Sequence, residues 1–316
     1  MKILVTGALG QIGSELTEAL ASRYGKNSVI ATDKQNDAPD LEYTYTHLNV
    51  LEKNQIEKII KTYNINTIYH LAAILSAAAE EDPMSAWEVN MEGLCHILEI
   101  AREYNCSLFT PSSIGVFGPD TPKNKTPQIT IQRPSSIYGI TKVSGELLCN
   151  YYYSKFGIDT RGLRYPGIIS NKTLPGGGTT DYAVEIYYEA LKKGKYKCFL
   201  HENTALDMMY MPDAVHAAIK LMEAPGKNLT HRNAFNITAM SVTPKNISKS
   251  IKKYIPDFKI EYEIDQTKQE IANSWPNNID DSKAKKQWDW KAKYDLDSMT
   301  QDMLDKLSIK LGIDYK

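Results

Sequence analysis

Three glycines spaced three residues apart directly follow the first apolar run of the chain. Residues 2–6 are predicted to form a strand, and Gly7, Gly10 and Gly13 come after it and open a predicted helix at 12–24. Glycines there allow a tight turn and let phosphates approach the backbone amides, while the helix N-terminus adds partial positive charge. The arrangement indicates a pyrophosphate-binding turn. The alternative is an ordinary strand-turn-helix with glycines placed by chance.

An acidic residue, Asp33, ends the second predicted strand at 29–33, 20 residues after Gly13. A carboxylate at this place typically binds the ribose hydroxyls of the adenosine half of a dinucleotide, and it repels a 2′-phosphate. The sequence therefore predicts NAD as cofactor and disfavours NADP.

Strand and helix patterns alternate through the first half of the chain. Strands are predicted at 2–6, 29–33, 43–50, 67–71, 107–110 and 159–165, with helices at 12–24, 53–63, 83–104 and 136–156. Such alternation predicts the α/β class, with a doubly wound parallel sheet (Rossmann) that carries helices on both faces.

The alternation breaks at 171–180, where three glycines after a proline predict a loop. We expect residues 1–171 to form an NAD-binding Rossmann domain, with returning segments near 206–238. Residues 172–316 should form mainly a smaller, partly interleaved C-terminal α/β domain that binds substrate. Later helices are predicted at 181–193, 213–223, 244–254 and 295–311, with a strand at 234–238 that returns to the main sheet. The run Gly176–Gly178 is expected to order over bound substrate.

Charge and residue counts exclude several classes of protein. Lys plus Arg is 37 and Asp plus Glu is 38, so the chain lacks the basic excess of nucleic-acid-binding proteins, and a small-molecule partner is expected. No apolar stretch approaches a transmembrane length, and the first apolar run is too short for a signal-peptide core. Four dispersed cysteines without CxxC favour the cytoplasm. Neither they nor the six histidines form a ligand pattern, so no metal is predicted.

Three tyrosines have a lysine four residues later, namely Tyr138/Lys142, Tyr151/Lys155 and Tyr188/Lys192. Spacing alone does not distinguish them. Only Tyr138 follows a serine-containing strand end by about one loop, whereas the other two pairs lie inside predicted helices, where this spacing commonly gives surface pairs. Tyr138 and Lys142 are therefore the predicted catalytic pair.

Together these motifs resemble those of the extended short-chain dehydrogenase/reductase family. The residues that carry the resemblance are Gly7, Gly10, Gly13, Asp33, the run 70–73, Asn90, Ser113, Tyr138 and Lys142. It spans the whole chain and implies an NAD-binding domain followed by a small substrate domain. Narrower similarity at 73–76, 111–119, 163–170, 178–183 and 274–276 points to the short-chain-type L-threonine 3-dehydrogenases. Asn49 departs from that family's usual Asp, although its amide can still hydrogen-bond to adenine.

The resemblance implies oxidation of L-threonine at its hydroxyl carbon to 2-amino-3-oxobutyrate, with hydride transfer to NAD, in threonine catabolism and without a metal. Tyr138 would take the hydroxyl proton, Lys142 would favour the phenolate and hold the nicotinamide ribose, and Ser113 would orient the substrate oxygen. Asn90 would support Lys142 through water. Its alternative is a helix residue that faces solvent.

The resemblance and the motifs together predict three sets of site residues. The catalytic set is Ser113, Tyr138, Lys142 and Asn90. The cofactor set is Gly7, Gly10, Gln11, Ile12, Gly13, Asp33, Asn49, Val50, Leu71, Ala72, Ala73, Asn90, Tyr138, Lys142 and Tyr165. The substrate set is Ser76, Ser112, Ser113, Tyr138, Thr179, Thr180, Asp181 and Trp275.

Structural alternatives exist for two of these residues and for Arg164, which belongs to none of the three sets. Asp181 is either a partner for the ammonium of the substrate or the N-cap of the next helix. Trp275 either closes the pocket or belongs to a core. Arg164 is either a carboxylate partner or part of a structural pair.

Two other functions remain open, a nucleotide-sugar epimerase or dehydratase of the same family and a non-catalytic NAD sensor, which would be expected to lose Tyr138 or Lys142. A homodimer through the helices at 83–104 and 136–156 is also predicted. The apolar residues considered for that interface are Leu94, Ile97, Leu98, Leu147, Leu148 and Tyr151, with packing on their own sheet as the alternative.

Overall fold

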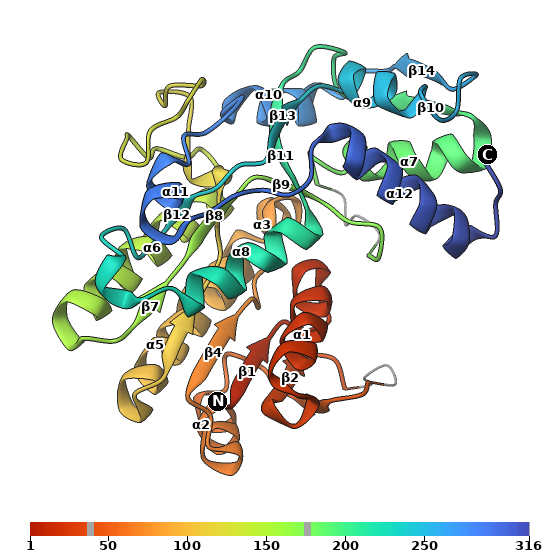
Figure 1. The fold of residues 1–316 in the computed structure, drawn as a ribbon. Helices are drawn as coiled ribbons and strands as arrows, with labels where there is room; N and C mark the ends of the chain where they lie inside the picture. The colour runs from red at the N-terminus through yellow and green to blue at the C-terminus, as the bar shows by residue number, and fades with distance from the viewer. Residues whose placement is uncertain (37–40, 174–177, 316) are drawn as a thin grey trace.

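The computed structural model describes residues 1–36, 41–173 and 178–315 (Figure 1). Within these residues, six strands pair in parallel in the order β3-β2-β1-β4-β5-β7. Their bounds are β1 Ile3–Thr6, β2 Val29–Asp33, β3 Thr44–His47, β4 Thr67–His70, β5 Ser107–Phe109 and β7 Thr160–Arg161. The predicted α/β class with a doubly wound parallel sheet is confirmed.

Side chains point alternately to the two faces along each strand, and apolar side chains lie on both. Both faces of this sheet are therefore covered by helices. Ile3 and Val5 of β1 belong to one core, together with residues of α1 (Gln11–Tyr24) and α8 (Met211–Glu223). Leu4, between them, belongs to the core on the opposite face. That core is shared with α2 (Lys53–Tyr63), α5 (Gly93–Tyr104) and α6 (Ile137–Phe156).

The helix predicted at 83–104 is present, but it is not uniform. It consists of α4 (Pro83–Trp87), a π-helical segment η2 (Glu88–Glu92) and α5. Pro83 stands in its first turn, and the carboxylate of Asp82 accepts a hydrogen bond from the Ser85 N–H at 3.1 Å. π-Helical turns often occur at functional sites, and this one carries Asn90.

The single strand predicted at 159–165 is wrong, because the chain leaves the main sheet at Gly162. Strand β8 (Leu163–Tyr165) pairs instead with β6 (Ser112–Ser113) and β12 (Phe235–Asn236). The Gly162 N–H donates to the Arg232 carbonyl and the Phe235 N–H donates to the Gly162 carbonyl, both at 2.9 Å. The returning segment predicted at 234–238 therefore pairs with β8, not with a strand of the six-stranded sheet.

A third core is built by elements that lie above the central sheet in the view of Figure 1. It is enclosed by α7 (Tyr182–Lys193), α9 (Pro244–Ile251) and α12 (Leu296–Leu311). Two small sheets join it, β13-β11-β9 (Met240–Val242, Leu206–Tyr210, Gly167–Ile169) and β10-β14 (Lys195–Cys198, Lys259–Tyr262). The helices α3 (Ser76–Glu81), α10 (Gln266–Ser274) and α11 (Ser282–Trp288) were not predicted. No helix in the described part of the chain has the length and apolar character needed to cross a membrane.

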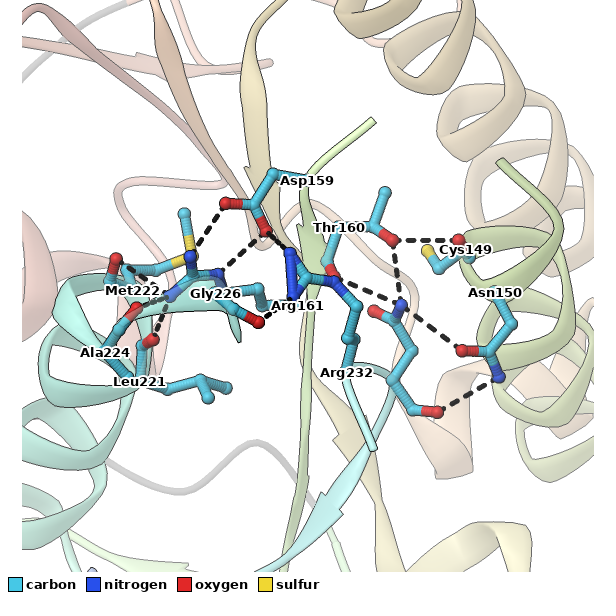
Figure 2. Close-up of polar contacts among 11 residues, drawn as sticks. Cys149, Asn150, Asp159, Thr160, Arg161, Leu221, Met222, Ala224, Gly226 and Arg232 are labelled. Atoms are coloured by element: carbon cyan, nitrogen blue, oxygen red, sulfur yellow. Dashed lines mark hydrogen bonds and ion pairs between the residues drawn. The ribbon is translucent and has the colours of Figure 1, made fainter. Parts of the chain in front are cut away.

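A buried ionic network fixes the C-terminal end of α8 against β7 (Figure 2). One guanidinium nitrogen of Arg161 donates to the carbonyls of Leu221 and Ala224, at 2.6 and 2.7 Å. The Asp159 carboxylate pairs with both Arg161 and Arg232, whose side chains are 6% and 7% exposed. A cation at this end binds carbonyls of the last helical turn, and its charge interacts favourably with the negative end of the helix dipole.

Candidate active site

The largest group of predicted site residues lines one cleft of about 410 Å³. The cleft follows the carboxyl ends of β1 and β4, which are neighbours although they are not consecutive in sequence. Open α/β sheets bind ligands at such a switch in strand order. Every predicted site residue except Asn90 and Thr179 lines this cleft.

The glycine turn leaves no room for side chains. Gly7 has φ +68°, and a Cβ added there would lie 2.7 Å from the Ala72 nitrogen. A Cβ on Gly13 would lie 2.0 Å from the Gly7 carbonyl oxygen. Gly10 occupies the N-cap of α1, and Gln11 and Ile12 of the first turn line the cleft. A bare backbone turn before a helix N-terminus fits a dinucleotide pyrophosphate.

Asp33 lies beside this turn at the end of β2. One of its carboxylate oxygens accepts a hydrogen bond from the Leu9 N–H at 3.1 Å, and the other accepts one from the Lys34 N–H at 2.8 Å. The carboxylate therefore braces the glycine turn as well as facing the cleft. Lys34 also lines the cleft, and its position next to Asp33 is the only sequence signal for it.

Asn49 and Val50 line the same end of the cleft. The Asn49 side-chain oxygen accepts a hydrogen bond from the Leu51 N–H at 3.1 Å, which closes a tight turn before α2. Val50 packs on Gly93, where an added Cβ would lie 2.9 Å from a Val50 methyl carbon. The Asn49 amide group is thus held in place by its own loop.

Ser113, Tyr138 and Lys142 meet in the middle of the cleft. Ser113 ends β6, and its hydroxyl accepts the Gly115 N–H at 3.1 Å. A Cβ on Gly115 would lie 3.5 Å from the Ser113 hydroxyl oxygen and 3.3 Å from the Tyr138 ring, so the two side chains face the same point. The Lys142 ammonium donates to the Pro111 carbonyl at 2.9 Å and lies 5.5 Å from the centre of the Tyr138 ring. Serine, tyrosine and lysine in this arrangement can hold a hydroxyl substrate and move its proton.

Burial dominates the acid–base properties of this pair. It raises the pKa of Tyr138, and the hydrogen bond with Ser113 opposes it by lowering the same pKa. Burial also lowers the pKa of Lys142 to about 8. In the protein alone, burial therefore disfavours the phenolate expected from the sequence, and Ser113, not Lys142, is the group that opposes this effect. The positive charge of Lys142 is itself costly to keep.

Asn90 is buried and does not face solvent. Its side chain accepts the Ile74 N–H at 2.8 Å, donates to the Ile74 carbonyl at 3.1 Å and donates to the Thr141 hydroxyl at 3.2 Å. The solvent-facing alternative for Asn90 is wrong. Asn90 thus links the loop after β4 to Thr141 of α6, which immediately precedes Lys142.

Other predicted residues have partners within the protein. The Ser112 hydroxyl donates to buried Glu146 at 2.5 Å. Arg164 pairs with the same carboxylate, which agrees with the structural alternative for Arg164. The Tyr165 hydroxyl donates to the Ala214 carbonyl at 2.8 Å. Only part of each of these side chains is thus available to a ligand.

Small polar and acidic residues form the far end of the cleft. Ser76 begins α3, and Thr180 precedes α7 and packs close to Gly167. Asp181 occupies the N-cap position of α7, while its carboxylate accepts the Gly178 N–H. Thr179 is 4% exposed and is absent from the lining of the cleft.

Trp275 agrees with both of its interpretations, since it lines the cleft and packs against the third core. Gly176 and Gly177 belong to 174–177, which lies outside the described residues, so the expected ordering of that run stays a prediction.

The two competing Tyr/Lys pairs lie elsewhere. Tyr151 is on the outer surface of α6, 53% exposed. Tyr188 is buried, and its hydroxyl accepts a hydrogen bond from Lys310 at 3.1 Å. Neither tyrosine lines the cleft, so context separated the three pairs where spacing did not.

Metal-binding geometry is absent from the part of the chain described: no three His, Cys, Asp or Glu side chains come together there. The four cysteines, all described, are free thiols.

Comparison with known proteins gives a consistent family. A family model described as the NAD dependent epimerase/dehydratase family matches residues 3–238. An uncharacterized epimerase/dehydratase of Staphylococcus saprophyticus is 50% identical, over 100% of this chain and 99% of its own. The crystal structure of L-threonine dehydrogenase from Clostridium difficile is 59% identical with a TM-score of 0.96, covering 98% of each chain. The holo L-threonine dehydrogenase from Cupriavidus necator is 48% identical with a TM-score of 0.95, over 97% of this chain and 100% of that one.

Proposed function

The chain belongs to the NAD-dependent epimerase/dehydratase family, the extended short-chain dehydrogenase/reductases that its motifs resemble, and we propose that it oxidises L-threonine to 2-amino-3-oxobutyrate. NAD is the cofactor of this family. The observation that carries the proposal is the placement of Thr180 and Asp181 in the same cleft as Ser113 and Tyr138. High identity to solved L-threonine dehydrogenases supports it.

In the proposed reaction, the hydroxyl-bearing carbon of threonine loses a hydride and its hydroxyl loses a proton. Bound NAD supplies the hydride acceptor. Tyr138 takes the proton. The Ser113 hydroxyl lowers the pKa of Tyr138 before substrate binds, and it donates its one hydrogen bond to the substrate oxygen once threonine is bound. The products are 2-amino-3-oxobutyrate, NADH and one proton.

The residues around the glycine turn would hold the cofactor. The first turn of α1 would bind the pyrophosphate, Asp33 the adenosine ribose, and Lys142 the nicotinamide ribose. We assign these roles from the shape of the turn and from the position of Asp33 beside it, and we place NAD binding mainly in residues 1–171. Substrate binding would fall mainly in residues 172–316.

The two charged groups of threonine need separate partners. Asp181 has the sign to bind the ammonium, and Ser76 and Thr180 offer hydroxyl groups to the carboxylate. A nucleoside diphosphate needs cations for its phosphates, but no arginine lines the described part of the cleft, and its two lysines lie beside Asp33 (Lys34) and beside Tyr138 (Lys142). This contrast favours a small zwitterion over a nucleotide sugar.

The direct test compares NADH formation with L-threonine, L-serine and UDP-sugars side by side. We expect turnover with L-threonine far above that with L-serine and none with UDP-sugars. Conversion of a UDP-sugar without net NADH would instead support the epimerase alternative.

We further propose a homodimer in the cytoplasm. Leu147 and Tyr151 on α6 are 63% and 53% exposed, and Trp87 at the end of α4 is also exposed. Adjacent exposed apolar side chains on long helices favour a protein partner. Of the residues considered for this interface, Leu94, Ile97 and Leu98 pack inside their own core and Leu148 packs against it, so only Leu147 and Tyr151 remain exposed.

A further inference from the structure

Helix α6 presents three polar side chains at intervals of four residues, Tyr138, Lys142 and Glu146. Residues four apart on a helix lie one above the other on the same face. Each of these three contacts a different member of the consecutive segment 111–113. Tyr138 lies beside the Ser113 hydroxyl next to Gly115, Lys142 donates to the Pro111 carbonyl at 2.9 Å, and Glu146 accepts from the Ser112 hydroxyl at 2.5 Å. Two of the three contacts involve the predicted catalytic pair, and the third has no assigned role.

The Glu146 carboxylate is buried and fully engaged. Arg164 on β8 donates to both of its oxygens, at 2.9 and 2.7 Å, and both side chains are 6% exposed. Gln132 donates to it at 3.0 Å. Arg164 in turn donates to the Gln128 carbonyl at 2.8 Å. A buried carboxylate with this many hydrogen-bond partners is held in a single position, so it also holds the Ser112 hydroxyl in place.

We propose that Glu146 is a positioning residue. It holds Ser112 in place and thereby fixes the position of the neighbouring Ser113 side chain beside Tyr138. This inference rests on the proposed dehydrogenase function. Ser112 and Ser113 are neighbours in the two-residue strand β6, so their side chains point to opposite sides of it. The hydrogen bond from Ser112 to Glu146 on one side of the strand therefore limits the movement of the Ser113 side chain on the other side. A displacement of about 1 Å at a reacting group is enough to cost on the order of 100-fold in rate.

The clamp also explains why Ser112 lines the cleft without being free for substrate. Its hydroxyl proton is donated to Glu146, whereas the Ser113 hydroxyl accepts a backbone N–H, a contact that does not use the proton of Ser113. The two adjacent serines thus have different roles, Ser112 as an anchor and Ser113 as a contact with the reacting atoms.

The test uses Ser112→Ala, which removes the clamp but leaves the Glu146–Arg164 pair intact, together with Glu146→Gln. The matched control is Asp159→Asn, which removes the carboxylate that pairs with buried Arg161 and Arg232 (Figure 2). Asp159 does not line the cleft. Four quantities are measured for each protein: the melting temperature, the Kd for NAD, kcat and KM for L-threonine, and the pKa of Tyr138. The last comes from tyrosinate absorbance of each protein minus that of its Tyr138→Phe counterpart.

We expect Ser112→Ala to lower kcat about 10-fold while the Kd for NAD stays within about twofold. The pKa of Tyr138 should rise in this variant, because its hydrogen bond with Ser113 weakens. Asp159→Asn should lower the melting temperature without changing kcat or the pKa of Tyr138. If Glu146→Gln does not fold, the measurements on Ser112→Ala alone test the proposal.

The proposal is overturned if Ser112→Ala lowers only the melting temperature, as the control does. Absence of threonine oxidation by the wild type would instead overturn the proposed function. The titration of Tyr138 needs no substrate, so it still tests the clamp in that case.

Discussion

Asp33 serves two partners at the residue scale, because its carboxylate braces the glycine turn through the Leu9 N–H and also faces the cleft. Asp33→Ala should therefore weaken NAD binding about 10-fold and reduce discrimination against NADP. Asp33→Asn separates the two roles, since it keeps an acceptor for Leu9 but removes the charge. We expect the Asn variant to retain its stability and gain NADP binding, as measured by titration calorimetry. A wild type that binds both cofactors equally would refute this role of Asp33.

Tyr138 is the proposed base, and its hydroxyl is the only part of the side chain that Phe lacks. Tyr138→Phe should reduce kcat on the order of 10²–10⁴-fold, with the Kd for NAD nearly unchanged. Tyr151→Phe is the matched control, because Tyr151 has the same spacing to a lysine but lies on the outer surface of α6. Steady-state kinetics of the two variants check this, and comparable losses in both would remove the assignment.

Lys142 gives a prediction for stability against pH. Burial lowers its pKa from the ordinary 10.5 to about 8. Between these values the unfolded chain holds the proton and the folded protein does not, so the free energy of unfolding rises with pH. Below pH 8 the cost of the buried charge is present in full. Lys142→Met lacks this titration. Urea unfolding at intervals from about pH 7 to about pH 9.5 should show the wild type gaining stability relative to Lys142→Met, and a constant difference would contradict it.

The N-terminal end of α7 provides a test at the element scale. Thr180 and Thr179 are adjacent, but only Thr180 lines the cleft, whereas Thr179 is buried. Thr180→Ala should raise KM for L-threonine about 10-fold and KM for NAD by less than about twofold. Thr179→Ser changes the buried neighbour, keeps a hydroxyl at position 179, and is expected to leave both constants unchanged. Equal effects of Thr180→Ala on both KM values would mean that Thr180 does not bind substrate.

The elements that sequence patterns predicted are those with a continuous apolar period. The five strands from β1 to β5 and most long helices lie within a few residues of the predicted ranges, because burial on one or both faces sets their composition. The strand at 159–165 was mispredicted because a partner more than 60 residues away, at 232–235, determines where it breaks. Helix α10 has few apolar residues, and the π-helical turn at Asn90 gives no local signal.

The candidate site divides in a similar way. Residues in short motifs, such as Gly7, Asp33 and Tyr138, were predictable because one local geometry needs them together in sequence. Glu146 and Arg164 were not paired from sequence, since 18 positions separate them and only the packing of β8 against α6 brings them together. Thr179 and Thr180 are chemically alike, and only the direction of the turn before α7 distinguishes them.

At the scale of the whole molecule, the exposed apolar face of α6 gives a prediction about assembly. The wild type should be a dimer by light scattering at micromolar concentration. Leu147→Glu places a charge in the middle of this face and should yield monomers, because an unpaired charge is costly in a buried interface. Glu103→Gln, a change elsewhere on the surface, serves as the control. A wild type that is monomeric would remove the proposed interface.

The cleft lies between the core that includes α1 and α8 and the core that includes α7, α9 and α12. The glycine turn belongs to the first of these, and Thr180 and Asp181 precede α7 of the second. The central claim is that this cleft moves a hydride from the hydroxyl-bearing carbon of threonine to NAD. L-Threonine labelled with deuterium at that carbon tests it directly, with the NADH formed analysed by mass spectrometry. The account predicts one deuterium in each NADH and a slower rate than with unlabelled substrate when hydride transfer limits turnover. NADH without deuterium, or no NADH at all, would contradict it.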